Sequence, residues 1–109
     1  MNLQHLLRLE PEDDEDQVTA ETVKAAEKII AQVAKLQGAK PIYPTASADD
    51  GGAIHLRWKR SDNAIFRIVL TSLCINRVLA IETKYNQSDR RAIDIGAAAA
   101  WVAKRLGDV

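Results

Sequence analysis

The sequence predicts an α+β domain: an antiparallel sheet of three long strands plus a short edge strand, with an N-terminal and a C-terminal helix packed on one face. Residues 53–60 and 64–70 alternate between apolar and polar side chains, which is the period of half-buried strands. Apolar residues recur at helical spacing on both sides of this strand region. The connections between the strands are short, so neighbouring strands should pair antiparallel and both helices should cover the same face.

The first helix should begin at Thr19, a good N-cap residue, with Glu21 complementing the positive helix end. Gly38 should stop it, and Pro41 prevents its resumption. Its buried stripe comprises Val23, Ala26, Ile30 and Val33.

Residues 41–44 can form only a short edge strand, because proline cannot donate to a central ladder. Asp49-Asp50-Gly51-Gly52 is typical of a hairpin turn. In the strand that follows, Ile54, Leu56 and Trp58 share one face, which we predict to be buried beneath the helices.

Residues 61–63 should form a tight turn before the second long strand, 64–70. A turn at Thr71-Ser72 should lead into a third long strand, residues 74–84. We expect Ser88 to cap the last helix, with Asp89 in its first turn and Gly107 at its end.

Length and composition favour one soluble domain. The 109 residues are 47% apolar and 28% charged, and the single cysteine, Cys74, provides no disulfide framework. The first nine residues lack the features of a signal peptide, and no apolar run is long enough for a membrane span. We therefore expect a cytoplasmic protein without a membrane partner.

The formal net charge is zero, but the charges are unevenly distributed. Residues 10–16 include six acids, whereas residues 17–109 hold 14 basic and 9 acidic residues. We predict that residues 1–17 are a mobile, leucine-containing acidic arm and that residues 18–109 form the single α+β domain. The arm could fold back on the basic body, bind a basic partner, or act as a solvated linker. The acids assigned to partner binding are Glu12, Asp13, Asp14, Glu15 and Asp16.

A second candidate surface is the polar face of the strands. Arg57 and Lys59 lie opposite Trp58 on the pleat, and Arg67 should join them from the next strand. Arg60 and Arg77 come from the same neighbouring strands and add to the basic residues of this group. Such a face is either simply solvated or docks an acidic partner, the chain's own acidic segment, or nucleic acid. Trp101, next to the buried stripe of the last helix, is either an interface anchor or the rim of the core.

No pattern in the sequence predicts catalysis, a cofactor or a metal. His55 lies on the polar strand face without a Cys, Asp or second His at ligand spacing. No serine is framed as in a nucleophile elbow. The acids at 49–50 lack the alternation and the distal Glu of a calcium loop.

Residues 10–70 resemble a family of small uncharacterised bacterial proteins. The resemblance rests on the helix entry from Thr19 to Val23 and on a hairpin with Pro41, Pro44-Thr45-Ala46, Asp50-Gly51-Gly52, Ile54, Leu56 and Trp58. It implies an accessory or antitoxin-like partner protein, and no activity.

The expected order of elements is also similar to that of a double-stranded RNA-binding domain. That likeness implies that Arg90 and Arg91, at the start of the last helix, contact phosphates, with His55 nearby.

We therefore predict a non-enzymatic binding module of the antitoxin, immunity or inhibitor kind, whose partner is another protein. The alternative is duplex RNA binding through the basic sheet face and Arg90 and Arg91. A homodimer is compatible with either function.

Overall fold

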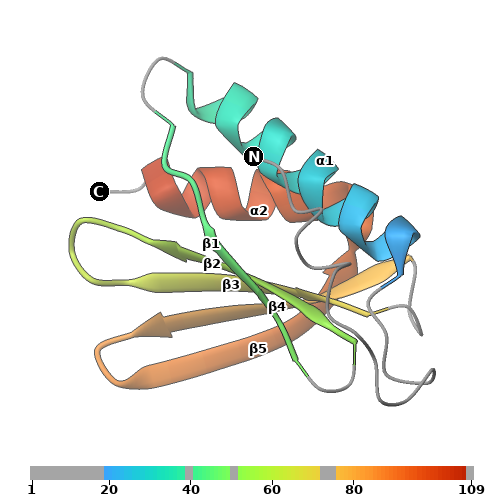
Figure 1. Ribbon diagram of the computed structural model, residues 1–109. Coiled ribbons are helices and arrows are strands. Elements are labelled where there is room, and N and C mark those ends of the chain that lie inside the picture. Colours follow the sequence, from blue (N-terminus) through green and yellow to red (C-terminus); the bar gives the residue numbers. More distant parts are fainter. Residues whose placement is uncertain (1–18, 39–40, 50–51, 72–75, 108–109) are drawn as a thin grey trace.

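The computed structural model describes residues 19–38, 41–49, 52–71 and 76–107. In these residues the fold is α+β, with two helices and a five-stranded antiparallel sheet. Each strand pairs with the next strand of the chain, and both helices lie on one side of the sheet (Figure 1). The elements are α1 (Ala20–Gln37), β1 (Thr45–Ala48), β2 (Ile54–Lys59), β3 (Ile65–Leu70), β4 (Arg77–Lys84), β5 (Gln87–Asp94) and α2 (Ile95–Gly107).

Helix α1 has the predicted ends. The Thr19 side chain accepts a hydrogen bond from the Thr22 amide at 3.2 Å, so one free N–H group of the first turn is satisfied. Gly38 follows the last helical residue with φ of 84°, in the left-handed region that glycine adopts without strain, and its N–H donates to the Ala34 carbonyl.

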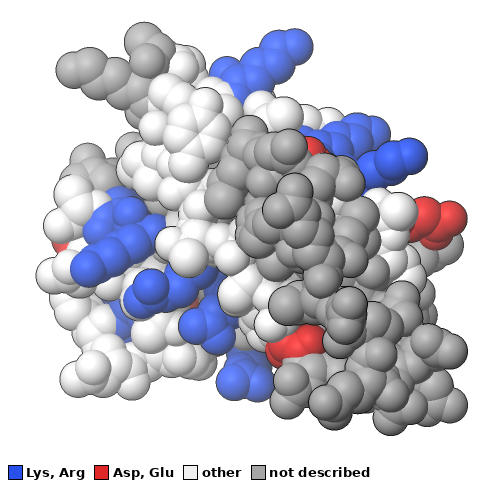
Figure 2. All heavy atoms as spheres, in the orientation of Figure 1, with Lys and Arg blue, Asp and Glu red and all other residues white. Residues whose placement is uncertain are grey.

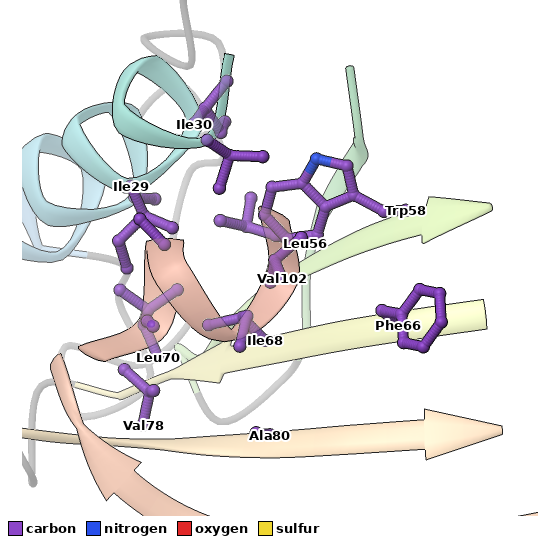
Figure 3. Close-up of a cluster of buried hydrophobic side chains, with 14 of the residues drawn as sticks. Ile29, Ile30, Leu56, Trp58, Phe66, Ile68, Leu70, Val78, Ala80 and Val102 are labelled. Atoms are coloured by element: carbon purple, nitrogen blue, oxygen red, sulfur yellow. The ribbon is translucent and has the colours of Figure 1, made fainter. Parts of the chain in front are cut away.

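The core lies between the helices and one face of the sheet, which we call the covered face. Trp58 is 1% exposed, and the alternate residues of β2 and β3 on its side of the sheet are also buried. Figure 3 shows Ile29 and Ile30 of α1 and Val102 of α2 gathered with these strand residues. The prediction that the Trp58 face is buried is therefore confirmed.

Helix α2 starts immediately after β5, and the Ile95 amide donates to the Asn76 carbonyl at 3.0 Å. Ala98 and Ala99 are buried, so the helix presents small side chains to the core and can approach its neighbours closely. Helix α2 packs against α1 and against β3, β4 and β5.

The predicted start of the last helix is wrong. Residues 88–94 belong to β5, which pairs with β4 along its whole length, from Lys84 opposite Gln87 to Arg77 opposite Asp94. A two-residue turn at Tyr85-Asn86 joins the two strands, and both residues have positive φ. Pairing with β4 therefore overrides the helix-capping signal at Ser88, and the described sheet has five strands instead of three long strands and a short edge strand.

The first strand is also shifted: β1 covers residues 45–48 instead of 41–44. As expected for a hairpin, β1 and β2 pair antiparallel and the Asp49 amide donates to the Ala53 carbonyl at 3.0 Å, while residues 50–51 of the predicted turn lie outside the described residues. Strand β4 starts at Arg77, later than predicted. The acidic arm, with Glu12, Asp13, Asp14, Glu15 and Asp16, and Cys74 lie outside the described residues.

Candidate functional site

The sheet face opposite the core, which we call the open face, collects most of the basic strand residues. Directly opposed residues of paired strands point to the same side, so the register fixes its members. The described strand residues on this face are Thr45, Ser47, His55, Arg57, Lys59, Ile65, Arg67, Val69, Arg77, Leu79, Ile81, Thr83, Ser88, Arg90, Ala92 and Asp94.

This face is strongly positive. Five of the strand residues just named are Lys or Arg, and Asp94, opposite Arg77, is the acid among them. On the side of the molecule seen in Figure 2, several Lys and Arg side chains gather over the strands, with few acidic side chains among them. The face is therefore suited to an anionic ligand.

One row of the open face, which we call the arginine row, carries most of this charge. Arg57 lies opposite Arg67, which lies opposite Ile81, which lies opposite Arg90. Ile81 is 8% exposed although it does not belong to the main core cluster. The row thus places three guanidinium groups and a buried aliphatic side chain across four adjacent strands.

Within the described part of the chain, neither Arg57 nor Arg67 forms an ion pair with a carboxylate. Like charges that face each other directly across a strand pair destabilise a sheet. The pairing of Arg57 with Arg67 therefore costs the free protein stability, which an anion bound between them would restore.

A shallow hollow of about 310 Å³ lies at the β1 side of this face. It is lined by Thr45, Ser47, Ala48, Asp49, His55, Arg57 and Arg67. His55 Nε2 donates to Asp49 Oδ2 at 2.7 Å, and Asp49 Oδ1 accepts from the Ala53 amide at 3.1 Å. The expectation that no Asp lies near His55 is thus wrong, because the hairpin turn brings Asp49 back to it.

The structure separates two residues that the sequence placed together. Arg90 lies on the open face, whereas Arg91, its neighbour in the strand, lies on the other side and contacts Asp89 at 3.3 Å. Both belong to β5, so neither starts the last helix. The position on which the RNA-binding likeness depended is therefore absent.

Arg60 does not belong to the open face. Its side chain is 5% exposed and donates to both carboxylate oxygens of Asp62, at 2.8 and 2.6 Å. It also donates to the Arg105 carbonyl of α2 at 2.6 Å, so Arg60 connects the β2–β3 turn to the last turn of the helix. The hydrogen bond from Arg60 holds the pKa of the Asp62 carboxyl well below its usual value.

Trp101 lies on the helix side of the sheet, at the rim of the core. Its ring meets Phe66 edge to face at a centroid distance of 6.1 Å, and the Arg105 guanidinium lies 4.2 Å from its centroid. The buried indole N–H has no hydrogen-bond partner among the described residues. These contacts place Trp101 away from the open face.

Among the described residues, no three His, Cys, Asp or Glu side chains are grouped so that they could hold a metal ion. Neither described helix is long and apolar enough to cross a membrane. No family model, curated protein or solved structure matches this chain. Both family resemblances therefore stay predictions.

Proposed function

We propose that this protein is a non-enzymatic binding module whose open face docks an acidic surface of another protein, in the manner of an antitoxin, immunity or inhibitor protein. The observation that carries the proposal is the row of Arg57, Arg67 and Arg90 on strands β2, β3 and β5, in which Arg57 and Arg67 lack a carboxylate partner among the described residues.

The composition of the open face favours a protein over a nucleic acid. Val69 and Leu79 are half-buried and lie opposite each other, next to the arginine row. Arginine is enriched in protein interfaces and is often one of their anchoring residues. The described strand positions of this face carry no Phe, Tyr or Trp, and the imidazole of His55 is hydrogen-bonded to Asp49, so the face offers little platform for stacking bases.

In this proposal the acidic arm also contacts the partner, through negative charges instead of positive ones. Glu12, Asp13, Asp14, Glu15 and Asp16 would engage a basic surface of the same partner, while the open face engages an acidic one. Charges of both signs on each protein would fix their relative orientation.

The test is binding of a fluorescent peptide of alternating Glu and Leu to the full chain, measured by anisotropy. Neutralising the row with Arg57→Gln, Arg67→Gln and Arg90→Gln should weaken binding by more than about tenfold. The matched control is Lys24→Gln, Lys28→Gln and Lys35→Gln, which removes the same charge from exposed positions of α1. This control should stay within about twofold of the parent.

Equal losses in the two triple variants would show that only net charge matters and would overturn the proposed interface. A duplex RNA oligonucleotide serves as the competing probe. Tighter binding of the duplex than of the peptide, with a steep loss on adding salt, would replace the proposed function with nucleic-acid binding.

A further inference from the structure

The hollow beside the arginine row is built from groups that bind oxyanions. Two guanidinium groups and two side-chain hydroxyls line it, together with the hydrogen-bonded pair of His55 and Asp49. We propose that this hollow binds the phosphate group of a phosphorylated side chain on the partner protein. The inference rests on the proposed function, because the hollow is part of the same open face.

The two guanidinium groups define the centre of the site. Arg57 and Arg67 are directly opposed on β2 and β3, which places their Cβ atoms about 4.5–5.5 Å apart. A phosphate group between them could accept hydrogen bonds from both planar forks at once. It would also replace the repulsion between two like charges with two attractions.

The β1 edge supplies neutral donors. Thr45 lies opposite Arg57, and Ser47 lies opposite His55, so both hydroxyls share the face of the guanidinium groups. The one carboxylate in the lining, Asp49, accepts hydrogen bonds from His55 and from the Ala53 amide. Both of its oxygens are therefore engaged by donors, and the imidazole ring is held in place.

Charge and size favour a phosphate over a carboxylate as the bound group. A phosphorylated side chain carries a charge of about −1.5 to −2 and three acceptor oxygens, which matches two cations and several donors better than a single negative charge does. The volume of about 310 Å³ is at the lower end of the range of small-ligand sites. It leaves room for a phosphate with the side chain that carries it.

The experiment compares three versions of one acidic peptide, with serine, phosphoserine or glutamate at a central position. The parent protein should bind the phosphoserine version at least about tenfold more tightly than the serine version, with glutamate close to serine. Arg57→Gln or Arg67→Gln should remove this ratio. Arg90→Gln, which removes the same charge from the same row outside the hollow, should weaken all three peptides and keep the ratio.

The variant Arg57→Lys separates geometry from charge, because it keeps the positive charge but loses the planar guanidinium group. It should lower the ratio of phosphoserine-peptide to serine-peptide affinity by several fold. Circular dichroism should show that each variant keeps the parent's fold, since the substituted side chains lie on the face away from the core.

The remaining outcomes would each overturn one or both of the proposals. Equal binding of serine and phosphoserine peptides would overturn the phosphate site and leave the acidic interface standing. No binding of any peptide would overturn both. If inorganic phosphate or a mononucleotide bound the hollow as tightly as the phosphopeptide, the ligand would be a free phosphate compound and the assignment to a phosphorylated partner would be wrong.

Discussion

At the scale of single residues, the molecule uses arginine in two opposite ways. Arg60 is buried and fully engaged by Asp62 and by the end of α2, and its guanidinium carbon lies 5.3 Å from the centroid of the Phe66 ring. Arg57 and Arg67 face each other across the open face without a carboxylate among the described residues. The first arrangement stabilises the fold. The second lowers the stability of the fold locally, as residues kept for binding often do.

The pairing of Arg60 with Asp62 predicts a specific acid sensitivity. Because the folded protein holds the pKa of Asp62 below the usual 3.8, this pair adds stability at neutral pH, and that stability is lost as the pH falls below about 4. In Asp62→Asn this part of the acid dependence should disappear. Urea unfolding at a series of pH values measures it, and an Asp62→Asn variant with the parent's acid profile would contradict the prediction.

At the scale of elements, the β4–β5 hairpin contains local strain. Tyr85 and Asn86 have φ of 52° and 64°, as a type I′ turn requires. Asparagine tolerates this region, but an aromatic residue does so at a cost. The ring of Tyr85 gains little in return, since it is 84% exposed and its contact with the Lys84 ammonium, 5.3 Å from the ring centroid, lies in solvent.

Replacing the turn with Tyr85→Asn and Asn86→Gly should therefore raise the free energy of unfolding by about 1 kcal/mol. Denaturant unfolding measures the gain as a shift of the midpoint without a change of slope. Tyr85→Ala removes the ring but keeps a Cβ in the left-handed region, so it should give little of the gain. A double variant no more stable than the parent would show that the turn is not strained.

The sequence predicted the elements whose local pattern and tertiary environment agree. Strict alternation in β2 and β3 identified both strands and the buried side of Trp58. Strand β5 was missed because Ser88-Asp89 is a helix-capping signal and Arg90-Arg91-Ala92 are good helix formers without alternation. Pairing with β4 decided its conformation, and a single-sequence pattern does not contain that interaction.

The candidate site on the open face was also predicted only in part. Alternation placed Arg57, Lys59 and Arg67 on one face, which the register confirms. The hollow was missed, because the contribution of Thr45 and Ser47 depends on the register of β1. Register follows from turn geometry as well as from hydrophobic pattern, and the pattern in β1 is weak.

At the scale of the whole molecule, one core joins both layers. Trp58 is among the largest fully buried side chains and lies in the cluster that includes residues of both helices. Removing its ring should therefore affect the helices and the sheet together.

Trp58→Ala should lower the free energy of unfolding by about 3–5 kcal/mol. Thermal and urea unfolding measure this loss, with Lys59→Ala, an exposed change on the same strand, as the control. A variant that melts within a degree or two of the parent would contradict the assignment of the core.

The order of the strands in the sheet also affects how the protein can fold while the chain is being synthesised. Because each strand pairs with the one made just before it, the sheet can grow hairpin by hairpin as the polypeptide leaves the ribosome. The helix layer cannot form in this way, since α1 is made first among the described elements and packs against α2, which is made last. Until α2 emerges, the part of the covered face that α2 packs against, on β3, β4 and β5, stays open to water and to other nascent chains, so aggregation during translation is the hazard that α2 removes.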